Sequence, residues 1–309
     1  MHAGDLAGAV SAFTAAIARS PRDARAYYQR GVCLGRQKKT AAAVTDYRAA
    51  LARNPKFAEA HNNLGAILSE QGKAAAAVVQ LREAVRYKAD YAEAWYNLGL
   101  ALSDLRRWGD AAKAYRRAAR LRPRDVDVHI NLGAALQHLN DIQGAIVHLG
   151  EAVKLRPKDP LARCGYGQLL AMKGRVAEAQ RQFEASTRVA PAYARGWSRL
   201  AFLWAKQKKY AVAIAALRRG IAKLPRAARL QVALGRVYRR WGKNGAAIAA
   251  YRRALHLQPQ LRRAYLLIGL AEAAQGHCRP ARRAFGRYLK GRSKGGDAMK
   301  KLMARCKKR

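Results

Sequence analysis

The chain has 309 residues, half of them hydrophobic, and its 61 lysines and arginines against 19 aspartates and glutamates give a formal net charge of +42. No apolar run approaches the roughly 18 residues of a membrane span, and the chain does not open with the pattern of a secretory signal. The charge is uneven: residues 1–150 hold 22 basic and 13 acidic side chains, whereas residues 151–309 hold 39 and 6. Such a positive field favours encounters with polyanions, although a composition bias toward arginine could also leave it as a solvated face.

The first predicted element is a lone helix within residues 1–23, which ends at Pro21. Val10, Phe13 and Ile17 share one face of it by the i, i+3, i+7 rule, but no earlier helix is available to cover that face. Either the chain is truncated at Met1, or an upstream segment or a second chain covers it. Self-association through this half repeat is therefore one alternative.

Eight helix pairs are predicted next, and residues 92–125 show their pattern most clearly. Gly99 in the first helix and Ala111 in the second have almost no side chain, so the two backbones can approach closely. Pro123 ends the second helix because it lacks an N–H and clashes with the preceding turn. The other pairs are expected at 24–57, 58–91, 126–159, 160–193, 194–227, 228–261 and 262–295.

A period of 34 residues holds through these pairs without an insertion. The small residue of the second helix recurs as Ala9, Ala43, Ala77, Ala111, Ala145, Ala179, Ala213, Ala247 and Ala281. The large residue four positions later recurs as Phe13, Tyr47, Leu81, Tyr115, Leu149, Phe183, Leu217, Tyr251 and Phe285. Several columns held in one register are strong support for a tandem repeat.

These residues resemble the tetratricopeptide repeat, W-x2-L-G-x2-Y…A-x3-F…P with a period of 34. The resemblance covers residues 1 to about 295. It implies an all-α fold, a right-handed α-solenoid (superhelix) of about eight and a half helix-turn-helix repeats that makes roughly one turn around a long concave groove. We expect a short capping helix within 296–309, followed by a basic tail.

The sequence offers little for catalysis. It contains no Gly-rich phosphate loop, H-E-x-x-H or G-x-S-x-G pattern. His61 and His129 take the place that Trp95 has in its own repeat, so we expect them to pack. His277 and Cys278 with Cys306 lack a fourth metal ligand and the usual spacing. We therefore predict that the chain is not an enzyme and uses no cofactor or metal.

The four cysteines give a weak indication of location. They lie far apart and form no C-x-x-C pair. Cys33 and Cys164 fall within predicted helices, where a thiol usually acts as a small apolar group. This pattern favours a reducing, cytoplasmic compartment.

The resemblance implies that the first helix of each repeat lines the groove, mainly through its second, fifth, sixth, ninth, twelfth and thirteenth residues. The sixth position holds Asn63, Asn97 and Asn131 in three successive repeats. This row is similar to that in the repeat region of O-linked N-acetylglucosamine transferases, where asparagines hold the backbone of an extended peptide. The row also follows from the common N-L-G form of the repeat, and both interpretations stay open.

The groove is expected to become basic over residues 194–295. Arginines at these positions would form a ladder that could follow an extended acidic chain. The basic groove residues are Arg195, Arg199, Lys206, Arg229, Arg236, Arg239, Arg240 and Arg263.

A second basic surface is expected on the convex side. It consists of arginine pairs in the second helices, at 116–117, 218–219 and 252–253. Tyr238 has the spacing of a core residue. Trp241, next to a turn, could pack or remain exposed.

Three functions follow, in order of preference. The first is a non-enzymatic scaffold that binds an extended acidic segment of a partner protein in its concave groove. The second is polyanion binding, to nonspecific nucleic acid or an acidic membrane surface, through the basic C-terminal half. The third is the targeting arm of a larger enzyme, such as a glycosyltransferase.

Overall fold

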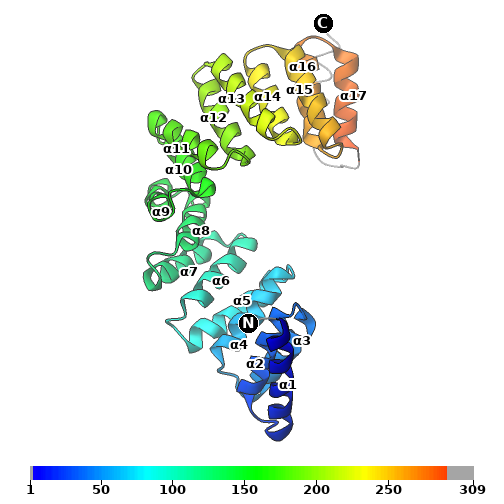
Figure 1. The fold of residues 1–309 in the computed structure, drawn as a ribbon. Coiled ribbons are helices and arrows are strands. Elements are labelled where there is room, and N and C mark those ends of the chain that lie inside the picture. The colour runs from blue at the N-terminus through cyan, green and yellow to red at the C-terminus, as the bar shows by residue number, and fades with distance from the viewer. Residues whose placement is uncertain (1–2, 291–309) are drawn as a thin grey trace. The chain divides into compact units, whose positions relative to one another are not determined.

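The computed structural model describes residues 3–290, and every regular element in that part of the chain is an α-helix (Figure 1). The helices follow one another as antiparallel pairs, so the protein is an all-α repeat solenoid, as predicted. The first helices of the pairs are α2 (Ala24–Arg36), α4 (Ala58–Glu70), α6 (Ala92–Asp104), α8 (Val126–His138), α10 (Pro160–Met172), α12 (Ala194–Lys206), α14 (Ala228–Arg240) and α16 (Arg262–Ala274).

The second helices are slightly longer in most repeats. They are α1 (Ala3–Arg19), α3 (Thr40–Arg53), α5 (Ala74–Tyr87), α7 (Trp108–Leu121), α9 (Ile142–Leu155), α11 (Val176–Val189), α13 (Tyr210–Lys223), α15 (Asn244–Leu257) and α17 (Cys278–Leu289). The capping helix predicted within 296–309 lies outside the described residues.

The chain divides into two compact bodies, an N-terminal body of Met1–Leu155 and a C-terminal body of Arg156–Arg309. Each body contains several complete helix pairs. The single superhelical turn expected from the resemblance depends on how the two bodies are joined, and it stays a prediction.

Close packing inside each repeat depends on a small residue that faces a large one. A Cβ atom added at Gly65 would lie 2.6 Å from Cγ of Leu81, so only glycine fits there. In the repeat 194–227 the roles are exchanged: Gly220 of the second helix faces Trp197, whose Cγ would lie 2.7 Å from an added Cβ. The usual pairing also joins Gly31 to Tyr47, Gly99 to Tyr115, Gly133 to Leu149, Gly167 to Phe183, Gly235 to Tyr251 and Gly269 to Phe285.

The fourth residue of several first helices ties its helix to the turn before it. Trp95 donates from Nε1 to the carbonyl oxygen of Ala89 over 2.9 Å. Nε2 of His61 and of His129 make the same contact with the carbonyl oxygens six residues earlier, over 2.9 and 2.8 Å. Both histidines are buried, 8% and 7% exposed. The prediction that they pack in place of Trp95 is confirmed.

The half repeat at the start of the chain packs on one side only. Helix α1 contacts α2. Val10, Phe13 and Ile17 are half-buried, and none of the α1 side chains that the structure describes is fully buried. Self-association through this helix stays a prediction.

Candidate binding surfaces

Three successive first helices pack against one another in each body. In the C-terminal body α12 packs directly against both α10 and α14, and in the N-terminal body α6 packs against α4 and α8. No two successive second helices come as close within residues 3–290. Because the first helices are closer together, they occupy the inner side of the curve in each body. We call this side the inner surface.

On the N-terminal body, the three predicted asparagines are already engaged with the preceding repeat. Asn97 donates from Nδ2 to Oδ1 of Asn62 over 2.9 Å, and Asn131 donates to the hydroxyl of Tyr96 over 3.1 Å. Asn63 makes the corresponding, longer contact with the hydroxyl of Tyr28, at 3.4 Å. Each bond joins the sixth position of one first helix to the fifth position of the one before it. The asparagine row therefore acts as a set of ties between repeats.

The centre of this network is Asn62, which the sequence analysis did not single out. Its side chain is fully buried. It accepts from Asn97 and donates from Nδ2 toward the hydroxyl of Tyr91 at 3.2 Å and Oε1 of Glu93 at 3.3 Å. A buried amide is stable only where such partners satisfy it. The signal available in the sequence was the Asn62–Asn63 doublet, because adjacent residues of a helix point about 100° apart and the two amides therefore face different neighbours.

The carboxylate of Glu59 on the inner surface of the N-terminal body is also paired. Nζ of Lys88 lies 2.8 Å from Oε1 of Glu59. Burial alone raises the pKa of Glu59, but the hydrogen bonds from Lys88 and from the backbone outweigh that effect, and the pKa lies below its ordinary value. Several polar side chains on the inner surface of this body are thus already bonded to other residues of the protein.

The C-terminal body places its cations differently. All the predicted groove arginines and Lys206 are exposed, except Arg199, which is half-buried. None of them forms an ion pair with a described residue. Between Glu184 and the end of the described chain, the only carboxylate is that of Glu272. The positive charges of these predicted groove residues are therefore not neutralised by any described carboxylate.

Two buried groups show where some of these arginines converge. Burial raises the pKa of the Cys164 thiol to about 11, while the positive charges of Arg199 and Arg195 oppose the rise. Burial likewise raises the pKa of the Tyr193 hydroxyl, and the charges of Arg195 and Arg229 oppose it. Arginines from both α12 and α14 therefore act on the same small region at the start of α12.

The same inner surface exposes large apolar side chains. Leu161 and Met172 of α10 are 45% and 55% exposed, and Phe202 of α12 is 54% exposed. They occupy the second, thirteenth and ninth positions of their helices, which belong to the set that the resemblance places in the groove. Apolar side chains among unpaired arginines are typical of an interaction surface.

The remaining predicted groove cations lie further along the body. Burial raises the pKa of the Tyr251 hydroxyl, and the nearby charges of Arg239 and Arg236 oppose that rise. These two arginines therefore lie close to the contact of α14 with α15. Arg240 and Arg263 are exposed and have no partner among the described residues.

The arginine pairs of the second helices each make one contact with a neighbouring repeat. Arg117 donates to the carbonyl oxygen of Ala89 over 3.3 Å, and Arg218 to the hydroxyl of Tyr238 over 3.3 Å. Arg252 lies 3.5 Å from Oε1 of Glu272.

The predicted lack of a metal centre was based in part on His277. Its Nδ1 lies 2.9 Å from Oε2 of the buried Glu272, so its contact is with that carboxylate. Within residues 3–290, no group of three or more His, Cys, Asp and Glu side chains could hold a metal ion. In the same residues, no helix has both the length and the apolar character needed to cross a membrane.

Solved structures support the fold. A tetratricopeptide repeat protein from Parabacteroides merdae superposes with a TM-score of 0.63 at 18% identity, over 80% of this chain and 98% of that one. Cut9-Hcn1, an APC/C hetero-tetramer, gives 0.57 at 21% identity over 85% of this chain and 52% of that one. Yeast Tom70 gives 0.53 at 16% identity, over 89% and 59%. The chain thus spans about half of the Cut9-Hcn1 chain that it matches. No curated protein matches the sequence.

Sequence profiles of the repeat match most of the chain. Profiles described as tetratricopeptide repeat or TPR repeat match residues 1–56 and 96–160, 66–105 and 235–276, 47–79, and 138–201. Together with the 34-residue helix pairs, these matches show that the chain belongs to the tetratricopeptide repeat family.

Proposed function

We propose that this protein is a non-enzymatic scaffold whose C-terminal body binds an extended acidic segment of a partner protein across the inner surface of α10, α12 and α14. The fold is typical of protein–protein interaction modules. The observation that supports the acidic partner is the convergence of Arg195, Arg199 and Arg229 without any described carboxylate to neutralise them.

The exposed apolar residues add a second requirement for the partner. Leu161, Met172 and Phe202 lie on the helices that carry Arg195 and Arg199 or on their direct neighbour. A segment that alternates carboxylates with apolar side chains would pair with both. The charges would set the rate and register of binding, and the apolar contacts would supply most of the affinity.

A labelled peptide of alternating glutamate and leucine provides a direct test by fluorescence anisotropy. We expect the double variant Arg195→Glu/Arg229→Glu to bind it at least about tenfold more weakly. The matched control is Arg219→Glu/Arg253→Glu, which makes the same charge change at exposed positions of α13 and α15. If both variants lose the same affinity, the inner surface is not the binding site.

Nonspecific polyanion binding is the second candidate function. It is favoured by the exposed arginines that both kinds of helix present across the C-terminal body. It predicts that binding of a random single-stranded oligonucleotide falls steeply as salt rises toward physiological strength. In that case both charge-reversal pairs should weaken oligonucleotide binding equally.

A cytoplasmic location remains a prediction. Cys33 and Cys164 are buried free thiols. Alkylation of the protein taken directly from cells, before and after reduction, would show whether its cysteines are reduced there.

A further inference from the structure

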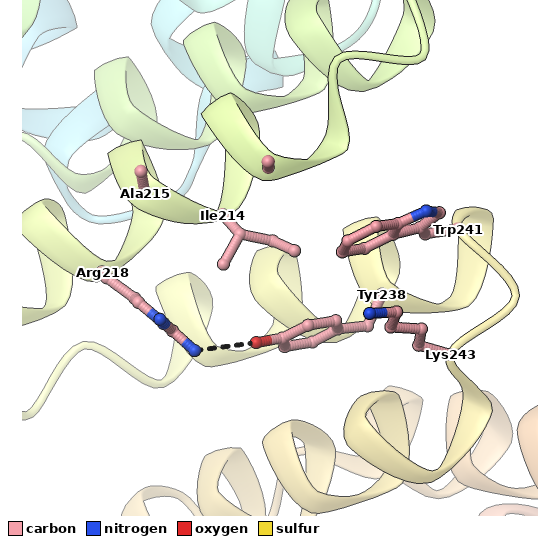
Figure 2. Close-up of a pocket in the computed structure, with 7 residues that line it drawn as sticks. Ile214, Ala215, Arg218, Tyr238, Trp241 and Lys243 are labelled. Atoms are coloured by element: carbon pink, nitrogen blue, oxygen red, sulfur yellow. Dashed lines mark hydrogen bonds between the residues drawn. The ribbon is translucent and has the colours of Figure 1, made fainter.

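A cavity of about 510 Å³ lies between α13 and the C-terminal end of α14 (Figure 2). It is apart from the arginines at the start of α12. One wall is aliphatic and belongs to α13, and the opposite side carries the rings of Tyr238 and Trp241. Its lining consists of Ala211, Ile214, Ala215, Arg218, Tyr238, Trp241 and Lys243. We call it the Trp241 pocket.

Two cations border the pocket. Nη2 of Arg218 donates to the hydroxyl of Tyr238 over 3.3 Å, and Nζ of Lys243 lies 3.8 Å from the centroid of the Trp241 ring (Figure 2). A tyrosine hydroxyl and an indole ring are neutral partners. They orient the two cations without cancelling their charge.

The equivalent arginine of the next repeat lies beside a carboxylate. Arg252 has the position of Arg218 one repeat later, and there the buried Glu272 stands where Tyr238 would be. A smaller cavity of about 380 Å³ in the N-terminal body contains Arg30, whose guanidinium is paired with Asp46 at 2.7 Å. Of these three arginines, Arg218 of the Trp241 pocket is the one that does not lie beside a carboxylate.

Trp241 itself is unusual for its position. The equivalent residues of the other repeats are Gln37, Gln71, Leu105, Leu139, Lys173, Gln207 and Gln275. The indole remains 39% exposed, although it stacks on Tyr210 with ring centroids 5.8 Å apart. An exposed tryptophan that is held in place by packing loses little entropy when a ligand covers it, which is why such residues are frequent binding hot spots.

We propose that the Trp241 pocket binds one large apolar side chain of a partner protein whose neighbouring residues are acidic. The side chain packs between Ile214 and the rings of Trp241 and Tyr238. The flanking carboxylates pair with Arg218 and Lys243. The lining favours a peptide side chain because Ala211, Ile214 and Ala215 form an aliphatic wall opposite the rings, and this wall gains most from burying an apolar group.

The test compares two labelled peptides of equal charge by fluorescence anisotropy. In the first, one phenylalanine stands between glutamates, and in the second glycine replaces the phenylalanine. Burial of a phenylalanine should make the first peptide bind about tenfold or more tightly. The ratio of the two affinities measures the contribution of the phenylalanine side chain, because simple charge attraction acts on both peptides equally. The variants of Trp241 then show whether that contribution comes from this pocket.

Trp241→Gln should reduce that ratio to near one. Glutamine is the residue of four equivalent positions, so the repeat accommodates it. Arg218→Gln should weaken both peptides by several-fold, while the matched control Arg219→Gln should change neither by more than about twofold. If Trp241→Gln lowers the melting temperature, Ala215→Leu takes its place: this exposed lining residue of α13 would fill the pocket with its larger side chain, and the ratio should again fall to near one.

Three results would overturn the proposal. The first is equal binding of the two peptides to the unmodified protein. The second is a ratio that survives in Trp241→Gln. The third is binding of a single-stranded oligonucleotide that depends on Trp241 while neither peptide does. Arg195→Glu/Arg229→Glu should leave the ratio intact, so a failure of the inner surface and a failure of this pocket are distinguishable.

Discussion

The two bodies present the same helix positions on their inner surfaces and fill them with opposite chemistry. In the N-terminal body, Asn97 is bonded to the buried Asn62, and Glu59 is paired with Lys88. In the C-terminal body, the corresponding positions carry Arg199 and Arg195, which have no carboxylate partner among the described residues. The repeat thus sets the geometry. A few side chains decide whether the polar groups of the surface bond to one another or remain available to a partner.

Replacing Asn62 by alanine should have the largest effect on this comparison. The side-chain amide of Asn97 would lose its acceptor inside a buried network. We expect the free energy of unfolding to fall by about 2–3 kcal/mol, as measured by urea denaturation followed by circular dichroism.

The matched control is Val232→Ala, at the same repeat position in the C-terminal body. It removes only apolar contacts of a half-buried side chain and should cost about 1 kcal/mol or less. Equal losses in the two variants would mean that the asparagine network contributes nothing beyond packing.

Helix packing, in contrast, should respond in the same way in both bodies. Gly65→Ala and Gly235→Ala each force a methyl group against the facing Leu81 or Tyr251, and each should cost about 1–3 kcal/mol. Gly286→Ala is the control, because an added Cβ there meets no atom within 4 Å. It should stabilise α17 by up to about 1 kcal/mol, through helix propensity. A much smaller cost in one body would show that its helix pairs can move apart.

The smallest expected effect tests where the arginines of the C-terminal body lie. Burial raises the pKa of Cys164 to about 11, and the positive charges of Arg199 and Arg195 keep it from rising further. Since only the thiolate reacts, alkylation of Cys164 should be slow at neutral pH and accelerate up to about pH 11. Removing the two charges in Arg195→Gln/Arg199→Gln should raise the pKa further and slow the reaction at each pH below that.

Mass spectrometry of the peptide that contains Cys164 gives this rate without interference from other cysteines. The control is Arg219→Gln, which leaves Arg195 and Arg199 in place. A faster reaction in the double variant would mean that the two arginines do not stabilise the thiolate.

Periodicity was sufficient to predict the fold. The small residues Gly99 and Ala111 and the packing of His61 in the place of Trp95 were predicted because these positions recur every 34 residues. That Gly99 faces Tyr115 is seen only in the structure. Local spacing also indicated that Tyr238 packs, and its ring does lie against two core clusters.

The surfaces were harder to predict, because their chemistry depends on contacts between repeats. The sequence singled out Asn63, Asn97 and Asn131 but not Asn62, since the bond from Asn97 to Asn62 spans 35 residues and joins two different helix positions. It also left Trp241 undecided. The pocket beside that residue forms only when Ile214 of one repeat and Tyr238 of the next come together.

The Trp241 pocket belongs to a junction between α13 and α14, and neither repeat contains it alone. Inserting a different repeat, such as residues 126–159, between residues 227 and 228 would therefore separate Arg218 from Tyr238 and abolish the site without altering a single side chain. The gain or loss of one repeat can thus create or remove a ligand site. In a protein of this type, the binding specificity depends on the order of the repeats as well as on their sequences.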